Sequence, residues 1–162
     1  MPSPQPSLQP GAQLRLALEQ LKNGAYHSPD WGDYQLVDGV FYRPPATKDE
    51  SPQLYSSVLS EAVFGDLNGD GFQDAAVILT TYNGGNGNTK ELAVVLDQDG
   101  SPANVVTIPV GFQAAVEAVE VKEGDILLQL RVLGPNDGLC CPSQAETHRY
   151  RLENGKLVGP IP

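Results

Sequence analysis

Residues 34 to 42 read Tyr-Gln-Leu-Val-Asp-Gly-Val-Phe-Tyr, two short strand-like runs on either side of Asp38-Gly39. Because Asp-Gly tolerates positive φ angles, this dipeptide predicts a type I′ turn between two antiparallel strands. Pro44-Pro45 ends the second run, since proline cannot donate to a strand ladder. From this hairpin onward the apolar residues keep a period of two, which makes β-structure the expected fold class.

Eight further segments downstream of the hairpin have the pattern of strands. They are residues 54–59, 75–81, 91–96, 105–109, 115–121, 126–133, 147–152 and 156–158. Short connections rich in Asp, Asn and Gly separate several of them, for example residues 97–100, 123–125 and 153–155. Such connections favour antiparallel neighbours in a meander.

The segment before the hairpin has a different period. Leu14, Leu18 and Leu21 fall at i, i+4 and i+7, which predicts an amphipathic helix over residues 11–23. Asn23-Gly24 supplies its stop signal, because glycine accepts the left-handed conformation after a helix. We therefore expect an α+β fold, a curved antiparallel β-meander of about eight to ten strands with one N-terminal helix packed on it.

The length of 162 residues predicts one domain. Residues 1–10 contain four prolines and few apolar side chains, so we expect a disordered linker there and a single globular domain over residues 11–162. The net charge is −10, from 20 acidic and 10 basic residues. This sign argues against nucleic acid as a partner. Because no apolar run approaches about 20 residues, a transmembrane segment is not expected either.

One stretch has the composition of a cation site. Residues 64 to 77 read Phe-Gly-Asp-Leu-Asn-Gly-Asp-Gly-Phe-Gln-Asp-Ala-Ala-Val. Oxygen-bearing groups recur at alternate loop positions 1, 3, 5, 7 and 9, which are Asp66, Asn68, Asp70, the backbone carbonyl of Phe72, and Asp74. Gly71 at position 6 permits the sharp turn that such loops need. This spacing predicts a structural Ca²⁺ site, because Ca²⁺ takes six or more oxygen ligands.

The loop departs from an EF-hand at position 12, where Val77 replaces the bidentate Glu. Instead, the stretch resembles the calcium loop of FG-GAP repeats, the integrin α-subunit type, in which Phe-Gly precedes the acidic loop and two strands flank it. That resemblance covers about fourteen residues and implies a cation site. It does not carry over the propeller fold of those proteins, since this chain has a single copy.

Two adjacent cysteines, Cys140 and Cys141, lie in the turn-rich stretch that begins at Gly134. They form either a vicinal disulfide or two small free thiols, and the sequence leaves both alternatives open. A zinc site is disfavoured, because paired ligands normally need intervening residues. Ser143 precedes His148 by five residues, but no nucleophile motif surrounds this pair, so no catalytic residue is assigned.

The order of the helix, the Val-Asp-Gly-Val-Phe-Tyr hairpin, the acidic loop and the Cys-Cys-Pro-Ser segment resembles small exported, often lipoprotein-associated bacterial domains. This resemblance implies an exported, periplasmic or cell-envelope location, with a lipid tether ahead of the domain; a cytoplasmic location is the alternative. We expect a non-catalytic, calcium-stabilised binding or accessory module whose partner is a protein or small ligand. The alternative is a small redox protein or hydrolase that uses the Cys140-Cys141 loop or His148.

Overall fold

The computed structural model describes residues 12–30, 32–43, 55–83 and 87–161, so the predicted linker lies outside the described residues. Within these ranges the chain forms one short helix, α1 (Leu18–Lys22), and eleven strands. The strands are β1 (Ala25–Ser28), β2 (Gly32–Gln35), β3 (Val40–Arg43), β4 (Tyr55–Gly65), β5 (Asp74–Asn83), β6 (Asn88–Gln98), β7 (Ser101–Phe112), β8 (Ala115–Lys122), β9 (Asp125–Val132), β10 (Gln144–Glu153) and β11 (Lys156–Val158).

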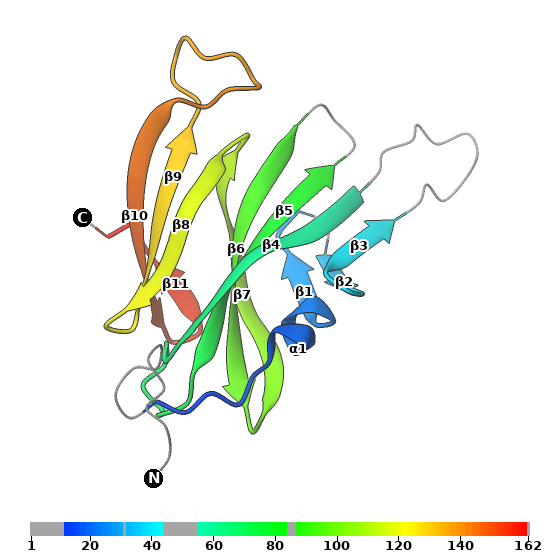
Figure 1. Cartoon of the computed structure of the whole chain (residues 1–162), viewed down its shortest axis with the longest axis vertical. Coiled ribbons are helices and arrows are strands. Elements are labelled where there is room, and N and C mark those ends of the chain that lie inside the picture. Colours follow the sequence, from blue (N-terminus) through cyan, green and yellow to red (C-terminus); the bar gives the residue numbers. More distant parts are fainter. Residues whose placement is uncertain (1–11, 31, 44–54, 84–86, 162) are drawn as a thin grey trace.

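The strands form three sheets in which neighbouring strands follow the chain order. Strands β3 to β7 make a five-stranded sheet, β8 to β11 make a four-stranded sheet, and β1 pairs with β2, all antiparallel. The curved antiparallel meander is thus confirmed, but it is divided between two large sheets. Figure 1 shows the four-stranded sheet on one side of the five-stranded sheet, with α1, β1 and β2 on the other.

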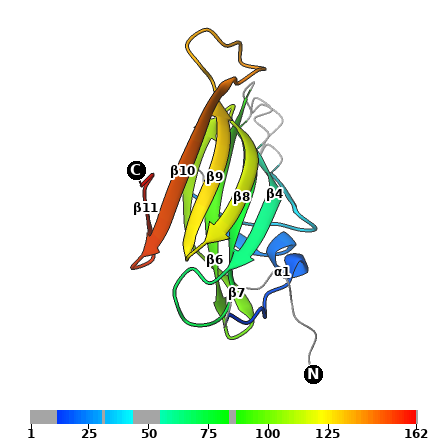
Figure 2. The same cartoon turned by 60° about the vertical axis from the view of Figure 1, so that its left-hand side comes forward.

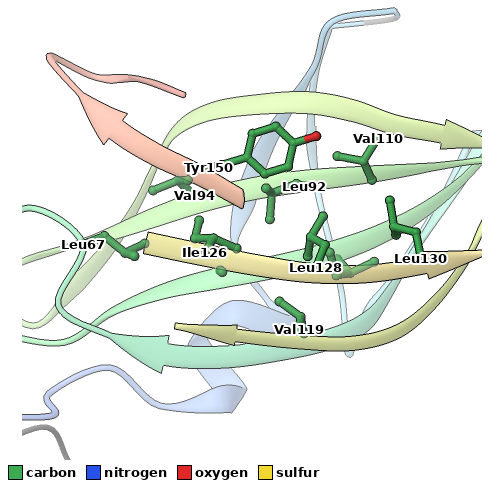
Figure 3. Packing of buried hydrophobic residues seen from close by; sticks show 11 residues of the cluster. Leu67, Leu92, Val94, Val110, Val119, Ile126, Leu128, Leu130 and Tyr150 are labelled. Carbon is green, nitrogen blue, oxygen red and sulfur yellow. The ribbon is translucent and has the colours of Figure 1, made fainter. Parts of the chain in front are cut away.

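The main core lies between the two large sheets. Figure 3 shows its apolar side chains pointing toward one another from both sheets. The buried members are Leu67, Ala76, Ile78, Leu92, Val94, Val110, Val119, Ile126, Leu128, Leu130 and Tyr150. Burial of this apolar surface is the main source of stability of the fold.

A second core lies on the opposite face of the five-stranded sheet, under α1, β1 and β2, which together form the N-terminal layer. Its buried members are Leu21, Tyr26, Tyr34, Leu36, Ala75, Val77, Leu79, Ala93 and Val95. Because successive strand residues point to opposite faces, β5 and β6 contribute alternate side chains to both cores. This explains why residues 75 to 79 are all apolar instead of alternating with polar residues.

The predicted turns are found where the sequence places X-Gly dipeptides. Asp38-Gly39 has φ angles of 51° and 86°, and Asp99-Gly100, Glu123-Gly124 and Asn154-Gly155 also have positive φ at both positions. The first turn joins Val37 and Val40 by an isolated bridge. After that bridge β3 leaves its partner and pairs with β4, so the turn is confirmed while the predicted hairpin is only one bridge long.

The predicted N-terminal helix over residues 11–23 is wrong in extent, because α1 has only five residues. Leu14 and Leu18 are 44% and 48% exposed, whereas Leu16 and Leu21 are buried. The reason lies in Gln13, whose backbone N–H and C=O bond to the chain at residues 71 and 73 and not within a helix. With one short helix, the predicted α+β class reduces to a mostly β fold.

Candidate metal centre

The acidic loop connects β4 to β5 and lies at the lower end of the molecule in Figures 1 and 2. Its approach to the four-stranded sheet requires a glycine, since a Cβ on Gly65 would lie 2.5 Å from Val121 of β8. The β8–β9 turn, which follows directly after Val121, also passes close by, with the Cβ position of Gly124 at 3.7 Å from the Asp66 carbonyl oxygen. The start of the loop therefore lies against the β8–β9 hairpin of the four-stranded sheet.

Three of the predicted ligands are brought together. Asp66, Asp70 and Asp74 each place one carboxylate oxygen within 4.8 Å of the others. Oxygens on opposite sides of a Ca²⁺ ion are separated by about 4.6 to 5.2 Å, twice a Ca–O distance of about 2.3 to 2.6 Å. The spacing of the three carboxylates therefore fits a hard cation of this size.

The loop conformation is set by its own side chains. The Asp66 carboxylate accepts hydrogen bonds from the backbone N–H groups of Gly69 and Gly71, at 2.8 and 2.9 Å. Both glycines have positive φ, 78° and 86°, a conformation that other residues rarely adopt. The Asp70 carboxylate accepts from the Phe72 N–H at 2.9 Å, and the Asn68 side-chain oxygen accepts from the Asp70 N–H at 3.3 Å. The acidic side chains are thus fixed on a tightly coiled backbone.

Asp74 is the buried member of the cluster, with no exposed surface. Its two carboxylate oxygens accept backbone hydrogen bonds from Leu67 and Asp97, each at 2.9 Å. Burial raises the pKa of Asp74 above its ordinary value, and the Asp70 and Asp66 carboxylates raise it further, while the two backbone hydrogen bonds act to lower it. A bound cation would offset the repulsion among these carboxylates.

The N-terminal segment supports the loop from outside. Gln13 donates its N–H to the Gly71 carbonyl at 2.9 Å and accepts from the Gln73 N–H at 2.7 Å. The Arg15 guanidinium lies 3.5 Å from the centre of the Phe72 ring and forms an ion pair with Asp97. The Phe72 side chain is therefore packed outside the site, as expected for a position that would supply only its backbone carbonyl.

Sequence reasoning missed this support. Arg15 is 82 positions from Asp97 in the sequence. The spacing of residues within a short segment cannot predict a contact over such a separation. The sequence predicts Asp97 only as part of the turn at residues 97–100, a role that it has, since its carboxylate accepts the Gly100 N–H at 2.8 Å. Its second contact, from its own N–H to Asp74, depends on how β5 and β6 pair.

The other predicted candidates lie away from the acidic loop. Cys140 and Cys141 are joined in a disulfide on the β9–β10 connection, at the upper end in Figures 1 and 2. Ser143 donates its hydroxyl to Asp137, and His148 contacts the Glu146 carboxylate at 2.9 Å and the Tyr150 hydroxyl at 3.1 Å. The structure thus gives Ser143 and His148 separate polar partners.

A surface hollow of about 360 Å³ lies between β1, β2 and the start of β7. His27 and Asp33 line it, with 2.7 Å between the imidazole Nδ1 and a carboxylate oxygen. Asn104 closes one side by accepting the His27 N–H at 2.9 Å. The hollow is separate from both the acidic loop and His148.

Comparison of the chain with protein-family models, curated proteins and solved structures found no match in any of the three. Among the described residues, no helix is long and apolar enough to cross a membrane.

Proposed function

We propose that this protein is a non-catalytic, calcium-stabilised binding or accessory module of the cell envelope. One observation carries the proposal. Asp66, Asp70 and Asp74 converge within 4.8 Å on a loop whose backbone is already coiled around the Asp66 carboxylate. In this proposal Asn68 and the Phe72 carbonyl complete the oxygen ligands, and the ion ties β4 to β5 without taking part in a reaction.

Calcium is favoured over softer metals by the donor set. Carboxylate, amide and carbonyl oxygens are hard ligands, whereas zinc and copper sites use His and Cys. Because position 12 carries Val77 and no bidentate Glu, we expect a dissociation constant of about 10⁻⁴ to 10⁻³ M, the range of extracellular modules. An affinity this low suits an exported protein that meets millimolar calcium. The partner is proposed to be a protein or a small ligand.

The test is thermal unfolding of the chelator-treated protein with and without 10 mM Ca²⁺ (about 10 to 100 times the expected dissociation constant). Binding to the native state alone should add about 1.4 to 2.7 kcal/mol. For a domain of this size that raises the Tm by about 3 to 10 °C. A Tm that calcium leaves unchanged would refute the proposed site.

Asp70→Asn is the informative variant, because asparagine keeps the side-chain acceptor for the Phe72 N–H while removing one anionic ligand. It should abolish most of the calcium-dependent rise. Asp99→Asn is the matched control, since it removes the same charge from an exposed turn at which asparagine tolerates the φ of 53°. Equal loss of the calcium effect in both variants would point to general charge screening instead of a site.

A further inference from the structure

The disulfide between Cys140 and Cys141 lies in an exposed part of the β9–β10 connection. Its two cysteines are neighbours in sequence, so it closes the smallest loop that a disulfide can close. Because the stabilising effect of a disulfide grows with the length of the closed loop, this bond constrains the unfolded chain very little. The fold therefore does not depend on it for stability.

The β9–β10 connection is also closed without the disulfide. The Asp137 carboxylate accepts hydrogen bonds from the N–H groups of Gly134 and Ser143, at 2.7 and 2.9 Å, and from the Ser143 hydroxyl at 2.8 Å. These contacts join the two ends of the connection and hold the pKa of Asp137 below its ordinary value, through the Gly134 bond first and then those of Ser143. The disulfide lies between these ends, in residues 135–142, which we call the cysteine tip, and constrains only that segment.

Among the described residues, the side chain of Gln113 connects the tip to the neighbouring strands. The Gln113 amide donates to the Leu139 carbonyl at 2.8 Å, directly before Cys140. The oxygen of the same amide accepts the N–H of Asn88 at 2.7 Å, where β6 begins. Gln113 therefore links the cysteine tip to the ends of β6 and β7, beside the exposed Phe112 and Leu139 side chains.

We propose that the Cys140–Cys141 pair is a reversible thiol–disulfide exchange site that controls the contact between Leu139 and Gln113. The reductant is a dithiol, either a small molecule or a protein. One of its thiolates attacks a cysteine sulfur, forms a mixed disulfide and releases the other cysteine as a thiolate that takes up a proton. Its second thiolate then attacks the mixed disulfide, so the protein gains two electrons and two protons, and the reductant leaves as a disulfide.

Loss of the bond frees the side chains of both cysteines and with them the peptide between them. The Cys141 N–H donates to the Gly138 carbonyl at 3.0 Å in the closed tip, and this turn is held by the ring. Opening the ring loosens the turn and weakens the Gln113 bond to Leu139, which changes the surface around Phe112 and Leu139. This inference is independent of calcium binding, since no acidic-loop residue takes part.

The experiment treats the native protein with dithiothreitol in the absence of denaturant, traps thiols with iodoacetamide and measures intact mass. We expect both cysteines to be alkylated while the far-UV circular dichroism is retained. Hydrogen exchange of the Cys141 and Asn88 amides should be about tenfold faster in the reduced protein, with the amides of β5 unchanged. A bond that resists dithiothreitol until the protein unfolds would overturn the proposal.

Cys140→Ser/Cys141→Ser is the matched control, and its exchange should equal that of the reduced wild type under both redox conditions. In Gln113→Ala the Asn88 amide should no longer respond to the redox state, although the cysteines still react. If exchange at Cys141 and Asn88 is the same in oxidised and reduced wild-type protein, the coupling through Gln113 is refuted even though the pair is reducible.

Discussion

Glu91 is a fully buried carboxyl group on β6, on the face that packs against the N-terminal layer. Its oxygen Oε2 accepts a hydrogen bond from the Ser28 hydroxyl at 3.3 Å, and Oε1 has no partner among the described residues. Burial raises the pKa of Glu91 from 4.5 to about 7; Ser28 and His27 act to lower it, and Asp30 acts to raise it. The proton is thus held more tightly in the folded than in the unfolded protein.

This difference predicts a pH dependence with a defined sign. Below pH 4.5 the group is protonated in both states; between pH 4.5 and about 7 only the folded protein keeps the proton, so stability falls as pH rises through this window. The loss is about 3 kcal/mol, at about 1.4 kcal/mol per pKa unit. Urea unfolding of wild type and Glu91→Gln at pH 4.5 and pH 8 measures it.

The comparison between the two proteins isolates Glu91 from the other carboxyl groups. Glu91→Gln should gain stability relative to wild type as pH rises, by about 3 kcal/mol between the two conditions. Any constant cost of burying the glutamine amide cancels in this difference. A difference between the two proteins that does not change with pH would mean that Glu91 titrates normally.

At the scale of elements, the N-terminal segment before α1 is held by a few specific polar contacts. Arg15 donates from Nε to the Asp97 carboxylate at 2.9 Å, and the Asp97 side chain is fully buried while that of Arg15 is 34% exposed. Among the described residues, Arg15→Ala would leave the Asp97 carboxylate with the Gly100 N–H as its one hydrogen-bond donor. The loss should cost about 2 kcal/mol, less than the roughly 3 to 5 kcal/mol of a fully buried pair, because Arg15 is partly solvated.

Arg131→Ala is the comparison for this variant, because Arg131 pairs with Glu117 at the surface, where both side chains are more than 40% exposed. Its loss should cost less than about 0.5 kcal/mol. Urea unfolding of both variants at pH 7 measures these two differences. If the two variants lose the same stability, the contact between Arg15 and Asp97 does not hold the N-terminal segment on the sheet.

The same segment shows where sequence patterns lose their information. Leu14, Leu18 and Leu21 fit the period of a helix, yet the backbone of Gln13 bonds to the acidic loop 58 residues or more further along the chain. The spacing of neighbouring residues cannot predict long-range backbone hydrogen bonds of this kind. Strand β1 was missed for a related reason, since only its pairing with β2 and its contact with Asn104 make it a strand.

The turns were predictable because the backbone conformation that they require depends on two adjacent residues. Asp38-Gly39, Asp99-Gly100 and Asn154-Gly155 need positive φ at two consecutive positions, and few dipeptides tolerate that. The acidic loop was predictable for the same reason, since its residues are adjacent in sequence. The division of the meander into two sheets was not predictable, because no local pattern marks that the consecutive strands β7 and β8 belong to different sheets.

For the whole molecule, the acidic loop and the cysteine tip lie at opposite ends of the two large sheets, as Figures 1 and 2 both show. Between them is an apolar core that begins at Leu67 in the loop and extends to Leu130 toward the other end (Figure 3). An interior of this kind packs in one arrangement, whereas coupling between distant sites needs an element with two arrangements that both sites bias.

Calcium binding and cysteine reduction should therefore act independently. The calcium-dependent rise in Tm, measured in oxidised and dithiothreitol-treated protein, should agree to within about 0.5 kcal/mol when converted to free energy. Cys140→Ser/Cys141→Ser, which cannot be reoxidised, serves as the reference for the reduced state. A larger difference would show that the core transmits a change from one end to the other, since no described contact joins Asp66, Asp70 or Asp74 to the β9–β10 connection.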